Sequence, residues 1–161
     1  MSSITTQIIG IVMLIFTITL SQRNLIINNE KTKFFIIASL LTIGIISLEI
    51  IEYYIISLNS TDYIIIHKII LVLGFSFSNL VIYVLLSLND TGKFSRNKLL
   101  VIPLIINIII NIASYWKGWA FYLDPQGQYF RGAYFYFQLI INTFYYILLI
   151  ISIFLNKNTY D

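Results

Sequence analysis

Five long apolar stretches, separated by short polar segments, limit the folds open to this chain more than any other feature of its sequence. They cover residues 4–20, 34–56, 63–88, 99–114 and 133–155. An α-helix needs roughly 20 apolar residues to cross the hydrocarbon core of a bilayer. Only 11% of the residues are charged, whereas about 25% is usual for a soluble domain. We therefore expect an all-α fold, a polytopic membrane bundle of five transmembrane helices that forms one domain over residues 1–161.

Residues 115–132, between the fourth and fifth stretches, combine aromatic residues with strong turn signals. Gly118, Gly132 and the sequence Asp124-Pro125-Gln126-Gly127 argue against a continuous helix there. The two arms, residues 119–123 and 128–131, are rich in aromatic residues and bounded by turn residues, which is typical of a short β-hairpin. We expect a hairpin-like loop with aromatic walls between the fourth and fifth helices.

The distribution of lysine and arginine predicts how the bundle is oriented. Loops on the cytoplasmic side of a membrane protein carry an excess of these residues. If the five stretches all cross, seven basic residues lie on the side of the C-terminus and three on the side of the hairpin. We therefore expect a multi-pass membrane protein with the N-terminus and the hairpin outside and the C-terminus in the cytoplasm. The seven are Arg23, Lys31, Lys33, Lys93, Arg96, Lys98 and Lys157, and the three are Lys68, Lys117 and Arg131.

Glu49 and Glu52 are the only acidic residues inside an apolar stretch. They are three positions apart and so share one face of a helix. In the expected orientation they lie roughly 10 Å and roughly 6 Å from its outer end. Ionisable groups at such depth usually face a bundle interior or a wet cavity and mark a functional site. A pocket for a ligand (an amine among the options), an ion or proton site, and a purely structural role in helix packing all remain open.

Two asparagines and the aromatic loop complete the candidate site. Asn111 and Asn142 are expected in the outer half of their helices, where asparagine either hydrogen-bonds a neighbouring helix or lines a pocket. The aromatic residues of the loop either form a belt at the membrane–water interface, where Tyr and Trp collect, or roof a ligand. We take as candidate ligand-binding residues Glu49, Glu52, Asn111, Trp116, Trp119, Tyr122, Asp124, Tyr129, Arg131 and Asn142.

The sequence carries no signature of catalysis or of metal binding. It has no cysteine for a disulfide or a thiolate site. His67 is the single histidine and cannot form an ordinary zinc site alone; its position beside Lys68 at a helix end suggests an interfacial residue. No Ser-His-acid set, HExxH motif or glycine-rich phosphate loop is present. We expect no catalytic residues, no cofactor and no metal, and no nucleic-acid partner, because no folded domain presents a basic face.

The segment from Arg96 to Phe137 resembles a known kind of membrane module. Its pattern is a basic linker, Ile102-Pro103 opening a helix, Gly118-Trp119-x-Phe121-Tyr122 with Asp124, and Tyr129-x-Arg131-Gly132 before the next helix. This resembles the N-terminal multi-helix sensor regions of GGDEF diguanylate cyclases of Firmicutes, which are related to the membrane sensor modules of some histidine kinases. Such modules usually continue to seven helices and a cytoplasmic catalytic domain, whereas this sequence holds five apolar stretches and no GGDEF or kinase motif.

The resemblance implies an input module in a bacterial cytoplasmic membrane, without enzyme activity of its own. A small molecule would bind beneath the hairpin, and a cytoplasmic output domain or signalling partner outside this sequence would read the change. The other partners that we consider are the lipid bilayer and a second copy of the chain in a homodimer. Two alternatives remain: a small transporter or substrate-capture subunit, and a structural subunit of a membrane complex without a ligand.

Overall fold

The structure, a computed structural model, describes residues 2–23, 29–58, 61–89 and 98–157. Over these residues the chain is mainly helical. The long helices are α1 (Ser2–Arg23), α2 (Asn29–Leu58), α3 (Ile64–Asn89), α4 (Val101–Lys117) and α5 (Phe135–Lys157). Two single-turn 3₁₀ helices, η1 (Thr61–Tyr63) and η2 (Lys98–Leu100), lead into α3 and α4. Two antiparallel strands, β1 (Phe121–Leu123) and β2 (Tyr129–Arg131), lie between α4 and α5.

Four of these helices are long and apolar enough to cross a membrane. Their apolar spans are Ile4–Gln22 in α1, Lys31–Leu58 in α2, Ile64–Leu88 in α3 and Phe135–Leu155 in α5. The fourth helix in the chain, α4, is also apolar but has only 17 residues. The predicted all-α fold is therefore confirmed, and its apolar helices are those expected of a membrane-spanning protein.

All five helices end later than the apolar stretches that predicted them, the first two also begin earlier, and α3, α4 and α5 begin one or two residues later. The first reaches Arg23 instead of residue 20, and the second begins at Asn29 instead of residue 34. Polar residues can continue a helix outside its apolar part, so composition alone places these ends poorly. At the end of α4 the chain stays helical to Lys117, three residues past the predicted boundary at 114. Gly118 then takes a φ of 64° and its N–H donates to the Ser114 carbonyl at 3.0 Å, which ends the helix.

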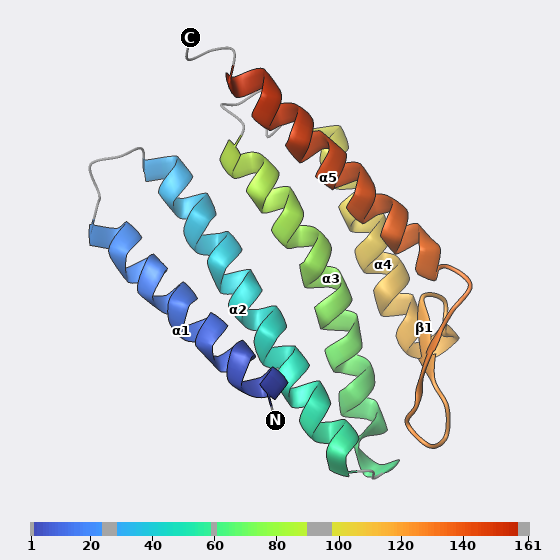
Figure 1. Ribbon diagram of the computed structural model, residues 1–161. Coiled ribbons are helices and arrows are strands. Elements are labelled where there is room, and N and C mark those ends of the chain that lie inside the picture. The colour runs from blue at the N-terminus through green and yellow to red at the C-terminus, as the bar shows by residue number, and fades with distance from the viewer. Residues whose placement is uncertain (1, 24–28, 59–60, 90–97, 158–161) are drawn as a thin grey trace.

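Helices that follow one another in the chain run in opposite directions, so α3 and α5, which are in contact, run the same way, and α3 is the central helix (Figure 1). It contacts α2 on one side and both α4 and α5 on the other, whereas α1 packs against α2 at the edge of the bundle. The junction of α2 with α3 and the hairpin lie at the same end of the molecule (Figure 1). This end therefore gathers residues from the middle and from the last third of the sequence.

The buried core lies among α3, α4 and α5. Its centre is formed by Ile82, Leu86, Leu104, Ile141 and Tyr145. The Tyr145 hydroxyl donates a hydrogen bond to the carbonyl of Leu100, so this buried phenol has a partner. The candidate span in α1, by contrast, has no buried residue. Its apolar side chains are available for contact with lipid.

The loop after α4 folds into a short β-hairpin whose turn is held by Asp124. The Gly127 N–H donates to the Asp124 carbonyl at 3.0 Å. One carboxylate oxygen of Asp124 accepts from the N–H groups of Gln126 and Gln128, at 2.9 and 2.8 Å. Gly127 has a φ of 80°, a conformation that glycine adopts without a steric penalty. The three-residue strands are shorter than the two predicted arms.

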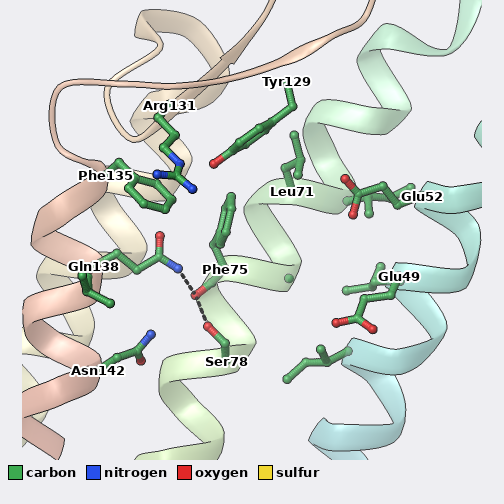
Figure 2. A pocket seen from close by; sticks show the side chains of 15 residues that line it. Glu49, Glu52, Leu71, Phe75, Ser78, Tyr129, Arg131, Phe135, Gln138 and Asn142 are labelled. Atoms are coloured by element: carbon green, nitrogen blue, oxygen red, sulfur yellow. Dashed lines mark hydrogen bonds between the residues drawn. The ribbon is translucent and has the colours of Figure 1, made fainter. Parts of the chain in front are cut away.

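A second buried cluster attaches the hairpin to α3. Leu71 of α3 packs with Ala120, Phe121 and Leu123 of the hairpin. The ring centres of Phe121 and Phe75 are 5.5 Å apart, so an aromatic pair reinforces the contact. The hairpin is thus a packed part of the fold, and one of its edges lies over the space between α2 and α5 (Figure 2).

Candidate functional site

A cavity of about 510 Å³ lies between α2, α3, α5 and strand β2. Pockets for small ligands have volumes of roughly 300–1,000 Å³. Five of the ten predicted site residues line it, from three different elements: Glu49, Glu52, Tyr129, Arg131 and Asn142. Side chains of α3, among them Leu71, Phe75 and Ser78, cover its floor (Figure 2). The rest of the lining is mostly aliphatic.

Glu49 and Glu52 form the acidic wall of the cavity, on α2 (Figure 2). Glu49 accepts a hydrogen bond at 3.1 Å from the side-chain amide of Gln7 in α1. Glu52 lies 3.2 Å from Nε2 of His67 in α3. His67 is only 3% exposed, so it is a buried partner of Glu52, and the expectation of an interfacial histidine is corrected. The direction in which the His67 side chain points depends on how α3 packs against α2, and the sequence does not show this packing.

Arg131, Gln138 and Asn142 form the opposite wall (Figure 2). The Arg131 guanidinium lies 4.7 Å from the centre of the Phe135 ring, a cation–π distance. Gln138 donates a long hydrogen bond of 3.5 Å to the carbonyl of Phe75. The side-chain oxygens of Gln138 and Asn142 are buried and have no hydrogen-bond partner. Both residues line the cavity, and the oxygen of each side-chain amide has unused acceptor capacity.

Gln138 was missed as a candidate site residue at the sequence level. The signal was present: it lies four positions before Asn142, so the two amides share one face of α5. Only the packing of α5 against α3 buries it.

The register of the hairpin decides which of its side chains reach the cavity. Phe121 pairs with Arg131, Tyr122 with Phe130, and Leu123 with Tyr129. Because side chains alternate between the two faces of a strand, Tyr129 and Arg131 lie on the same face as the buried Phe121 and Leu123. Tyr122 and Phe130 lie on the other face, where their rings stack at 5.4 Å. The face that packs on α3 is therefore also the face that borders the cavity.

Tyr129 lies at the hairpin edge of the cavity, near Arg131 and facing Glu52 across the opening (Figure 2). Burial raises the pKa of its hydroxyl above the ordinary value of 10.0, Glu52 adds to the increase, and Arg131 opposes it. The hydroxyl is therefore protonated at neutral pH and can donate a hydrogen bond into the cavity.

Replacing Tyr129 with phenylalanine should change how stability depends on alkaline pH. A group whose pKa is raised on folding contributes stability that is fully present below its unfolded pKa, about 10 for tyrosine, and is lost as the pH rises through the folded value. The difference in unfolding free energy between wild type and Tyr129→Phe should hence be constant up to about pH 10 and fall above it. Unfolding in detergent followed from pH 8 to 11 would test this, and an unchanged difference would contradict it.

The other five predicted site residues do not line this cavity, and their role in ligand binding stays a prediction. Asn111 is buried between α3 and α4, where its amide donates to the Ser76 hydroxyl at 3.4 Å. The indole of Trp119 packs at 5.6 Å on Tyr134, outside the cavity. The remaining three are Trp116, which is 74% exposed on α4, Tyr122, which stacks on Phe130, and Asp124, which caps the turn. Tyr122 lies on the face of the hairpin opposite to Tyr129 and Arg131, because side chains alternate along a strand.

The described residues bring together no group of three or more His, Asp and Glu side chains that could hold a metal ion. No family model matches the chain, and neither curated proteins nor solved structures give a match. The function of the chain therefore has to be inferred from the chemistry of the cavity.

Proposed function

We propose that this chain is the sensor module of a bacterial membrane signalling protein and that a small ligand binds in the cavity beneath the hairpin. The observation that carries the proposal is that one cavity is built jointly by α2, α3, β2 and α5, with polar side chains from α2, β2 and α5 pointing into it (Figure 2). The resemblance of residues 96–137 to cyclase-associated sensor regions supports the same function.

In this proposal all five helices cross the cytoplasmic membrane, with the N-terminus outside. Four have a sufficient apolar span. The 17 residues of α4 would extend about 26 Å at 1.5 Å per residue, which is close to the hydrocarbon thickness of about 30 Å. The bias of lysine and arginine toward the end opposite the hairpin supports this orientation. The cavity would then open toward the outside of the cell, and the last helix would lead into the cytoplasm.

A ligand in the cavity would connect two helices that α3 holds apart. It would touch Glu49 or Glu52 on α2 and Gln138 or Asn142 on α5. A ligand shifts the balance between two packings only if it binds them with different affinity. A ligand that draws α5 toward α2 meets this requirement, because only the closer packing allows both sets of contacts. A cytoplasmic output domain or partner would read the movement at the far end of α5.

The absence of cysteine from the sequence makes the movement measurable with spin labels. Ile37 of α2 and Phe154 of α5 are exposed and lie toward the helix ends remote from the hairpin. The double variant Ile37→Cys and Phe154→Cys carries a spin label on each cysteine and is mixed with pools of small amines, amino acids, organic acids and sugars. We expect one pool to change the distance between the two labels by about 1–2 Å. The pair Ile15→Cys and Ile37→Cys, which reports on α1 and α2, should not change.

Further measurements distinguish the sensor from a transporter subunit and from a structural subunit. The same pools should lose their effect when Glu49→Ala is added to the labelled protein, while Trp116→Ala, outside the cavity, should leave it intact. Flux of a labelled solute into proteoliposomes would instead favour the small transporter or capture subunit. If no pool alters the distance between the labels on α2 and α5, the sensor proposal fails and a structural subunit becomes the better explanation.

A further inference from the structure

Two opposite charges line the same cavity without meeting each other. Glu49 lies on the α2 wall and Arg131 on the wall formed by β2 and α5 (Figure 2). Among the described residues, neither has an ion-pair partner, whereas Glu52 is paired with His67. The neutral amide of Gln7 bonds Glu49 but does not compensate its charge. The ring of Phe135 beneath Arg131 likewise leaves the guanidinium formally uncompensated.

Both side chains are exposed, and a ligand that covers them and displaces their water must supply the opposite charges itself. Glu49 and Arg131 do not pair with each other, and α3 contributes the floor of the cavity between the two walls (Figure 2). A single cation would neutralise Glu49 and leave Arg131 without an anion. A single anion would do the reverse. A molecule that carries both charges would compensate both walls at once.

We infer that the cavity binds a small zwitterion of the amino-acid type, with its ammonium group toward Glu49 and its carboxylate toward Arg131. This inference rests on the proposed ligand-binding function and specifies the chemistry of the ligand. Arginine suits a carboxylate because its fork of N–H groups can donate two parallel hydrogen bonds. The protonated hydroxyl of Tyr129, close to Arg131, supplies a further donor.

The remaining lining fits the rest of such a molecule. The unpartnered oxygens of Gln138 and Asn142 can accept hydrogen bonds from a ligand, and Gln138 is itself 93% buried, being 7% exposed. Leu48, Leu71 and Leu139 supply aliphatic surface for an apolar side chain. With about 510 Å³, the space is also within the usual range of roughly 300–1,000 Å³ for small-ligand pockets. An amino acid with an aliphatic side chain matches each of these properties.

The first test compares ligands that differ only in charge. The full chain, purified in nanodiscs, is titrated calorimetrically with the twenty protein amino acids and glycine betaine. For an amino acid that binds, such as L-leucine, the matched probes are the amine that lacks the carboxylate and the acid that lacks the ammonium, here 3-methylbutylamine and 4-methylpentanoate. Each probe should bind about tenfold to 100-fold more weakly than the amino acid, since each loses a charge-assisted hydrogen bond.

The second test assigns the two charges to the two residues. In Arg131→Gln the amino acid should bind no better than the amine, and in Glu49→Gln it should bind no better than the acid. Lys117→Gln is the matched control, because Lys117 is a cation at the same end of the molecule but lies over Trp119, outside the cavity. It should leave all three affinities unchanged. Circular dichroism and gel filtration would show that the variants are folded, and the comparison of probes on wild type does not depend on them.

The outcomes distinguish this inference from the sensor proposal. If the amine binds as tightly as the amino acid, or if no member of the panel binds, the inference of a zwitterion is wrong. An amine that also shifts the distance between α2 and α5 would leave the sensor proposal standing. Conversely, an amino acid that binds with the expected preference but moves no helix would support the zwitterion site and remove the sensor function.

Discussion

Replacing Gly132 with alanine should lower the free energy of unfolding by about 3 kcal/mol, by separating the end of the second hairpin arm from the start of the first. A Cβ atom at this position would overlap the backbone carbonyl oxygens of Gly118 and Trp119. Residues 132–134 are held this close to residues 118–120 by two hydrogen bonds. The Gly132 N–H donates to the Ala120 carbonyl and the Tyr134 N–H to the Trp119 carbonyl, both at 2.8 Å. Backbone atoms cannot move aside as a flexible side chain would, so the substitution must break these bonds.

Unfolding in mixed micelles at increasing SDS fraction would measure the effect. Gly74→Ala is the matched control, because a Cβ atom at Gly74 would meet no atom within 4 Å. Alanine is also favoured over glycine in a helix by about 1 kcal/mol, so this variant should be neutral or slightly stabilised. Equal stability of Gly132→Ala and wild type would show that Gly132 does not lie against the backbone of Gly118 and Trp119 in the way described.

Breaking the contact between Glu52 and His67 should be the second most damaging change. In Glu52→Leu, Nε2 of the buried His67 loses its partner, at a cost of about 1–3 kcal/mol. His67→Leu should cost less, because the Glu52 side chain is 28% exposed and water can replace the histidine. When both residues are leucine no unpaired group remains, so the double variant should be more stable than the sum of the single effects by about 0.5–3 kcal/mol.

A double-mutant cycle of SDS unfolding curves would measure this coupling. The contact of Gln7 with Glu49 provides the comparison, since it is exposed. Gln7→Leu should change stability by no more than about 0.5 kcal/mol. Strict additivity of Glu52→Leu and His67→Leu would mean that the two side chains do not interact in the folded protein.

The sequence alone was sufficient to predict the secondary structure and part of the site. Apolar stretches of the length of a membrane helix predicted the helices, and the turn chemistry of Asp124 and Gly127 predicted where the chain reverses. The spacing of Glu49 and Glu52 placed both acids on one face of α2, and both line the cavity. These features depend on residues close together in the chain, so no knowledge of the packing is needed to read them.

Which side chains meet across the bundle was decided only by the tertiary structure. The helices are apolar on nearly all sides, because lipid and neighbouring helices demand the same kind of surface, so the sequence does not show which face of a helix turns inward. For this reason His67 and Gln138 were not expected in or beside the cavity, while Asn111 was. In the hairpin the register turns Tyr129 and Arg131 toward the cavity and Tyr122 away from it. The pairing of an acidic and a basic wall thus exists only once α2, α5 and the hairpin are packed around α3.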